Sequence, residues 1–145
     1  VSMQNHYNLI YREEEREMIP FCEDQKIAIT PYSPLASGRL TRDWTGDTKR
    51  SLTDQTSKMK YDQTMDQDRV IVERVAQVAE ELDVKRAQVA LAWLMQKEVV
   101  TVPIIGATKE SHLLDALPAI DVTLTPEQVA FLEEPYLPHQ VVGAR

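Results

Sequence analysis

Three short polar stretches carry the groups from which a small-molecule site could be built. Gln4 ends the first apolar stretch, Tyr32–Ser33 ends the second, and Gly106–Lys109 ends the third. A side-chain amide donates and accepts hydrogen bonds at once, as binding of a carboxamide requires. A tyrosine ring at the mouth of a strand can stack on a flat heterocycle. Taken one at a time, Gln4 and Tyr32 are better explained as a structural amide and a packed aromatic.

Two of these stretches have the composition of phosphate-binding turns. Ser33 to Arg39 offers hydroxyls, backbone N–H groups, the flexible Gly38 and a cation, which together suit a pyrophosphate. Gly106 to Lys109 places small residues and one cation at the start of an expected helix, which suits a phosphate monoester. A plain strand-to-helix turn explains this second stretch equally well. Neither the P-loop motif nor GxGxxG occurs, so the Walker and Rossmann interpretations fail.

The elements that must position these groups alternate between strands and helices. We expect strands at 1–7, 26–31 and 99–105, and helices at 12–24, 69–82, 86–96, 108–117 and from Thr125 onward. Pro20 predicts a kink or a second start in the first helix, and Thr108 is expected to cap the fourth. Residues 41–66 are polar with few periodic apolar positions, so they predict a long loop.

This order of elements is typical of an α/β fold with a parallel sheet. In such folds, ligands bind where the carboxyl ends of the strands meet the loops, so the three polar stretches are expected on one face. Three strands form a thin sheet with two open edges, and a complete eight-unit barrel needs about 250 residues. The 145 residues therefore look like the last three units of a (β/α)8 TIM barrel in one domain, and the start at Val1 looks like a cut edge.

Composition narrows the function classes. A net charge of −7 disfavours nucleic-acid partners, and no stretch approaches the roughly 20 apolar residues of a membrane span. The single cysteine, Cys22, is expected to be a small buried residue, and its lack of a disulfide partner favours a cytoplasmic setting. The three histidines are scattered, and neither HExxH nor CxxC occurs, so no metal site is predicted.

Five segments together resemble the aldo-keto reductases, with the closer likeness to the bacterial branch related to the potassium-channel β subunits. They are Gln4–Leu9, Pro31–Gly38, Ala87–Trp93, Pro103–Ala107 and Pro135–His139. This resemblance implies an eight-fold barrel in which the chain supplies strands six to eight and binds NADPH. The residues that it assigns to the cofactor are Gln4, Tyr32, Ser33, Pro34, Leu35, Ser37, Gly38, Arg39, Ile105, Gly106, Ala107, Thr108, Lys109, His112 and Asp115.

Within that set, the resemblance implies separate roles. Gln4 would bind the nicotinamide carboxamide, Tyr32 would stack on the nicotinamide ring, and the 33–39 stretch would line the pyrophosphate. The stretch from Gly106 to His112 would surround the adenosine 2′-phosphate, with Lys109 where family members often have an arginine. Asp115 stands where the family usually has a glutamate facing the adenine, and Ala116 replaces the usual asparagine.

The family's chemistry is hydride transfer to an aldehyde or ketone, with a proton from a tyrosine tuned by a lysine, an aspartate and a histidine. Those four residues come from the first half of the family's barrel, and this chain has no Asp followed five residues later by Tyr. No catalytic residue is therefore predicted, and the chain alone is expected to be inactive. Two alternatives remain: a non-catalytic half-barrel that binds a cofactor, the missing half or another copy, and a regulatory subunit like the channel β subunits.

Overall fold

A short parallel sheet lies at the start of the fold. The structure is a computed structural model that describes residues 1–44 and 54–141. Strand β1 (Ser2–Met3) pairs in parallel with β2 (Ala28–Ile29), with Ser2 opposite Ala28. Isolated parallel bridges continue the alignment, since Tyr32 pairs with both His6 and Ile104. The three expected strand segments therefore lie side by side and run in the same direction.

The third predicted strand, at 99–105, forms only isolated bridges. The N–H of Thr101 donates to the carbonyl of Ile29 (2.9 Å), and the N–H of Ile104 donates to that of Pro31 (2.8 Å). Pro31 and Pro103 have no N–H to donate, which removes rungs from the ladder. The first and second strands are also shorter than the predicted ranges 1–7 and 26–31.

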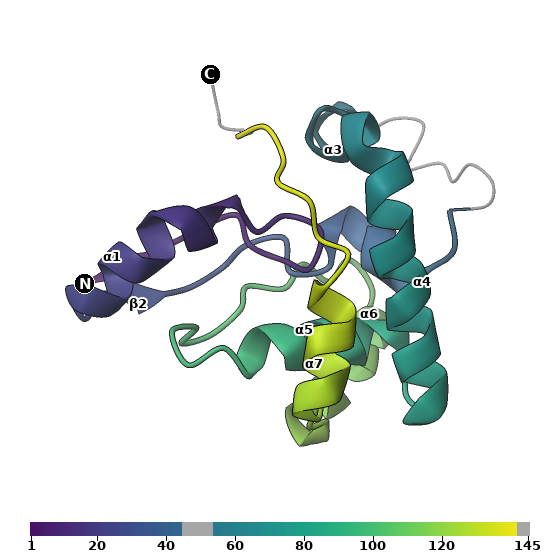
Figure 1. The fold of residues 1–145 in the computed structure, drawn as a ribbon. Coiled ribbons are helices and arrows are strands. Elements are labelled where there is room, and N and C mark those ends of the chain that lie inside the picture. The colour runs from purple at the N-terminus through teal and green to yellow at the C-terminus, as the bar shows by residue number, and fades with distance from the viewer. Residues whose placement is uncertain (45–53, 142–145) are drawn as a thin grey trace.

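Helices make up most of the remaining described chain, and 3₁₀ helices connect several of them (Figure 1). In order they are η1 (Glu13–Arg16), α1 (Met18–Asp24), η2 (Ala36–Thr41), α3 (Gln55–Tyr61), η3 (Asp62–Thr64), α4 (Met65–Glu81), α5 (Arg86–Met95), α6 (Glu110–Ala116), η4 (Leu117–Asp121) and α7 (Pro126–Glu133).

The predicted helix at 12–24 is divided in two. Its backbone breaks at Glu17, where φ is −145°, and α1 then starts afresh at Met18. Pro20 thus lies in the first turn of α1, where a missing N–H removes no intrahelical hydrogen bond. The prediction that Pro20 marks a second start is confirmed. Cys22 on α1 is fully buried, as expected for a small core residue.

The predicted loop at 41–66 is wrong for its described second part, and its residues 45–53 lie outside the described residues. From Gln55 onward this part is helical, and Asp54 caps α3 by accepting from the N–H of Ser57 (2.9 Å). The helix escapes a periodicity search because its packing depends on one fully buried large side chain, Tyr61. Helix α4 likewise starts at Met65 instead of Arg69.

The later helices follow the sequence more closely. Helix α5 covers the predicted range within one residue, and α7 begins at the predicted cap, Thr125. For α6 the predicted cap is wrong, because Lys109 stands at the N-cap position and its side chain makes no capping hydrogen bond. Thr108 therefore lies one residue before the cap.

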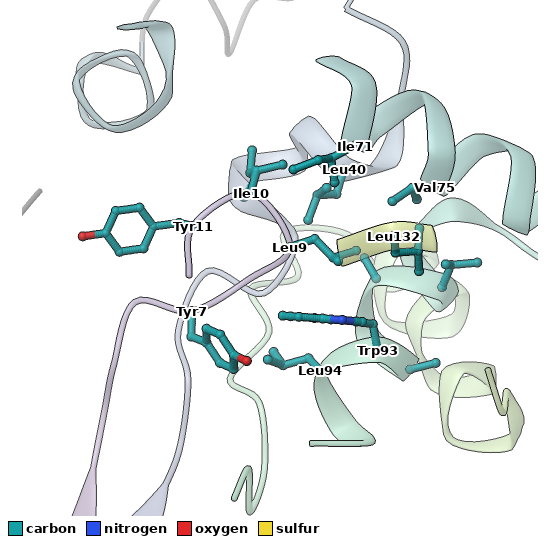
Figure 2. Close-up of a cluster of buried hydrophobic side chains, with 14 of the residues drawn as sticks. Tyr7, Leu9, Ile10, Tyr11, Leu40, Ile71, Val75, Trp93, Leu94 and Leu132 are labelled. Atoms are coloured by element: carbon teal, nitrogen blue, oxygen red, sulfur yellow. The ribbon is translucent and has the colours of Figure 1, made fainter. Parts of the chain in front are cut away.

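The core lies where α4, α5 and α7 pack together against the turn that follows β1 (Figure 2). Tyr7, Leu9, Trp93 and Leu132 are all at most 1% exposed. The Trp93 indole N–H donates to a carboxylate oxygen of Glu133 (2.8 Å), so its polar atom is satisfied inside the packed cluster. This core fixes the helices behind the strand ends.

Candidate functional site

The loop that follows β2 has an unusual backbone. Ser33, Ala36 and Ser37 have φ values of 57°, 48° and 57°, and Gly38 has a φ of 87°. Left-handed conformations are costly for residues other than glycine and gather at functional sites, where the surrounding structure holds them. The loop is held from below by Asn8, whose side-chain amide donates to the carbonyl of Ser33 (2.9 Å).

Asn8 is a positioning residue that sequence reasoning missed. It is fully buried, and its side-chain oxygen accepts from the N–H of Ile10 (3.0 Å), so the amide is fixed in a tight turn. Asn8 and Tyr11 exchange backbone hydrogen bonds of 3.1 Å around this turn. An asparagine that hydrogen-bonds the backbone two residues later is a known turn signal, and it could have indicated this role.

A cavity of about 950 Å³ opens at the carboxyl ends of the strand segments. One wall is the loop after β2, and a second wall combines the end of the 100–105 segment with α6. The predicted cofactor residues that line it are Tyr32, Ser33, Pro34, Leu35, Ser37, Gly38, Ile105, Gly106, Ala107, His112 and Asp115. Residues far apart in the sequence are therefore brought to one hollow.

The third wall was not predicted. It comes from α4, through Ala76, Ala79 and Glu80, and from the junction between α4 and α5, where Lys85 and Arg86 line the cavity. Polar residues at strand ends and in the loops after them indicate a binding site in the sequence. A helix that flanks the sheet carries no comparable local signal of a ligand. The small alanines leave room for a ligand at this wall.

The four other predicted site residues do not line the cavity. Gln4, Thr108 and Lys109 are exposed. Arg39 turns toward α3 and η3, where it pairs with Asp62 and donates to the Ser57 hydroxyl (3.4 Å). The predicted cation of the pyrophosphate loop is thus engaged elsewhere.

A buried polar cluster lies beneath Tyr32. The His6 ring stacks on the Tyr32 ring with centroids 5.1 Å apart, and its Nε2 lies 2.7 Å from the Tyr61 hydroxyl. Burial, aided by the nearby positive charge of Lys60, lowers the pKa of His6 to about 3, and burial raises the pKa of Tyr61 to about 12. Both groups are neutral near pH 7 and support the ring of Tyr32 from inside.

Charged side chains also line the cavity. Lys85 forms an ion pair with Asp115, and both residues line the hollow. The backbone carbonyl of Asp115 accepts from the side chain of Gln88 (2.8 Å), which ties α6 to α5. Arg86 pairs with Asp43 at 2.7 Å.

Two other tyrosine hydroxyls, of buried Tyr7 and half-buried Tyr136, are engaged by carboxylates. The Tyr7 hydroxyl donates to Glu15 (2.5 Å) and the Tyr136 hydroxyl donates to Glu13 (2.8 Å). Burial and the neighbouring carboxylates raise the pKa of both tyrosines far above the usual range.

Residues 1–44 and 54–141 contain no group of His, Cys, Asp and Glu side chains that could hold a metal ion. In that same part of the chain, no helix is both long and apolar enough to cross a bilayer.

Comparison with known proteins matches residues 1–136 to the family described as the aldo/keto reductase family. The chain is 40% identical over 143 residues to the versiconal hemiacetal acetate reductase of Aspergillus parasiticus, covering 97% of the chain and 41% of that protein. It is 42% identical over 146 residues to a putative aryl-alcohol dehydrogenase of Schizosaccharomyces pombe, covering 99% and 40%. A putative aryl-alcohol dehydrogenase of Saccharomyces cerevisiae is 38% identical over 141 residues, covering 97% and 41%.

The chain spans about two fifths of the length of these relatives. The match extends through the loop after β2 and through the residues of α6 that line the cavity, so it includes the candidate site. On this similarity the chain belongs to the aldo/keto reductase family, a family of oxidoreductases that generally use a nicotinamide cofactor.

Proposed function

We propose that this chain is the cofactor-binding part of an NADPH-dependent aldo-keto reductase that transfers a hydride from the nicotinamide to an aldehyde or ketone. In this proposal it forms the C-terminal portion, about strands six to eight, of a (β/α)8 barrel in the cytoplasm. The family implies such a barrel, and the names of the relatives, a reductase and aryl-alcohol dehydrogenases, support the reaction class.

The observation that carries this proposal is the cavity at the strand ends. Its volume of about 950 Å³ lies near the upper end of the usual range for small-molecule sites, as a long dinucleotide needs. In this proposal the nicotinamide stacks on Tyr32 in place of the Lys60 ammonium, which lies 4.6 Å from the centroid of that ring. The 33–38 loop offers hydroxyls and backbone groups for the pyrophosphate, and the adenosine lies beside His112 and Asp115.

Completing the site requires more protein than this chain. The family's proton donor and the three residues that tune it belong to the first half of its barrel, so we propose that the chain alone does not turn over substrate. The missing half of the barrel, or another copy, would pair with the open edge beside Val102 and Ile104, whose side chains are 52% and 43% exposed. Leu117 and Ile120, in η4, are further exposed apolar residues.

The proposal is tested by filling the cavity. Ala76→Trp places an indole on the α4 wall, where Ala76 lines the hollow. We expect at least a roughly tenfold weaker affinity for NADPH, because the indole takes the space of the ligand. The affinities of the unaltered chain and of the variant are measured from the change in NADPH fluorescence as each protein is added.

Gln77→Trp is the matched control, since Gln77 is the next residue on α4 and is exposed. It adds the same side chain outside the cavity and should bind NADPH as the unaltered chain does. Circular dichroism confirms that both variants fold. Equal NADPH binding by both folded variants would show that the cofactor does not occupy this cavity.

A further inference from the structure

The cations on the cavity wall differ from those that the sequence nominates. Arg39 pairs with Asp62 away from the hollow, and Lys109 is exposed outside it. Lys85 and Arg86, at the start of α5, line the cavity instead. A phosphate group bound in this hollow would therefore meet these two side chains before the predicted ones.

Lys85 is better placed than Arg86 to exchange partners. The side chain of Arg86 is 25% exposed and is held by Asp43 at 2.7 Å. The side chain of Lys85 is 60% exposed, and its four-carbon stem allows the ammonium to move. Its partner, Asp115, lies on the neighbouring helix α6 and also lines the cavity, so the pair lies where the proposed function places the adenosine.

The two partners favour different ligands. A carboxylate such as that of Asp115 accepts a hydrogen bond from a ribose hydroxyl but repels a phosphate. An ammonium such as that of Lys85 attracts a phosphate and forms charge-assisted hydrogen bonds with it. The Gln88 side chain donates to the backbone carbonyl of Asp115, and the ion pair with this carboxylate keeps the Lys85 ammonium at the cavity wall, where the proposed function places the ribose.

We propose that Lys85 is the residue that gives this cavity its preference for a cofactor with a phosphorylated ribose, and that Asp115 opposes that preference. The ion pair opens when a phosphate binds, and Lys85 then turns from the carboxylate to the phosphate. This inference rests on the proposed function, because it requires the adenosine end of the cofactor to lie between α6 and the start of α5.

Calorimetric titration with two adenosine fragments tests the inference without any turnover. Adenosine 2′,5′-bisphosphate carries the additional ribose phosphate, and adenosine 5′-monophosphate lacks it. Lys85→Gln should weaken binding of the bisphosphate about tenfold and leave the monophosphate nearly unchanged, because a charge-assisted hydrogen bond is lost only with the former. Lys85→Arg retains the charge and should restore most of the preference.

Asp115→Asn should raise the affinity for the bisphosphate relative to that for the monophosphate, which is the opposite of the change expected for Lys85→Gln. It removes a repulsive charge near the ribose phosphate and replaces a charged acceptor for the hydroxyl by a neutral amide, so the bisphosphate gains relative to the monophosphate. Lys26→Gln is the charge-matched control, since Lys26 is exposed and precedes β2 at the end away from the cavity. It should leave both affinities unchanged.

The outcomes separate this inference from the proposed function. If the chain binds both fragments and Ala76→Trp blocks both, but Lys85→Gln weakens them equally or not at all, the role of Lys85 is wrong and the cavity assignment stands. A larger loss of bisphosphate binding with Lys109→Gln than with Lys85→Gln also overturns the inference. If neither fragment binds to the unaltered chain, both proposals fail.

Discussion

At the scale of single residues, the buried ring of His6 makes stability depend on pH. Its pKa of about 3 in the folded chain lies below the ordinary value of 6.5, because burial and then the charge of Lys60 disfavour protonation. Between these values the unfolded chain binds a proton that the folded chain does not. The contribution of neutral His6 to the free energy of unfolding is therefore fully present above pH 6.5 and is lost as the pH falls toward 3.

The measurement compares urea unfolding of the unaltered chain and of His6→Gln at pH 7 and pH 5. Protonation of His6 in the unfolded chain lowers the free energy of unfolding by about 2 kcal/mol between pH 7 and pH 5. The unaltered chain should therefore lose about that much more stability than the variant. Equal losses in the two proteins would mean that His6 becomes protonated as readily in the folded chain as in the unfolded one.

At the scale of one element, α7 depends on its first turn. The Thr125 hydroxyl accepts from the N–H of Gln128 (3.2 Å), and the Gln128 side chain accepts from the N–H of Thr125 (3.0 Å). Thr125→Ala leaves a helix N–H without this acceptor and should lower the free energy of unfolding by about 1 kcal/mol, as measured by urea denaturation.

Thr123→Ala is the control for this cap, because Thr123 is exposed and lies two residues before it. The same atoms are removed without affecting the cap, so the change should be much smaller. Similar costs for the two substitutions would argue against a stabilising capping box.

At the scale of the whole molecule, Glu13 joins the two ends of the chain. Its carboxylate accepts from the Tyr136 hydroxyl (2.8 Å) and from the N–H of His139 (2.7 Å), and Figure 1 shows the tail after α7 returning past the first segments. His139 also reaches Asp68 on α4, at 2.8 Å. Burial raises the pKa of Glu13, but these hydrogen bonds and Arg16 outweigh it and keep the pKa below the usual value.

Glu13→Ala should therefore release the tail and destabilise the fold by about 2–4 kcal/mol, because a buried donor and a half-buried donor lose their acceptor. Limited proteolysis with chymotrypsin should cut the variant after Tyr136 faster than the unaltered chain, and urea unfolding gives the free energy. Glu17→Ala is the control, as Glu17 is exposed near the same 3₁₀ helix. A tail that is cut equally slowly in Glu13→Ala and Glu17→Ala would contradict this role for Glu13.

Sequence alone determined the features that depend on neighbours along the chain. The cap at Thr125 and the second helix start near Pro20 follow from local turn chemistry, and the parallel alignment of three strand segments follows from the alternation of strands and helices along the chain. Parallel strands necessarily bring their carboxyl ends to one edge, which is why most of the predicted site residues line one cavity. The same local rules failed at α3, whose packing depends on Tyr61 rather than on a repeated apolar pattern.

Tertiary structure alone decided which charged side chains face that cavity. Arg39 is drawn away by Asp62, 23 residues later, and Lys85 is drawn to the cavity by Asp115, 30 residues later. A long cationic side chain has many rotamers of similar energy, so a distant carboxylate selects its direction. The α4 wall and the support that Asn8 gives to Ser33 arise in the same way, from contacts that exist only once the chain has folded.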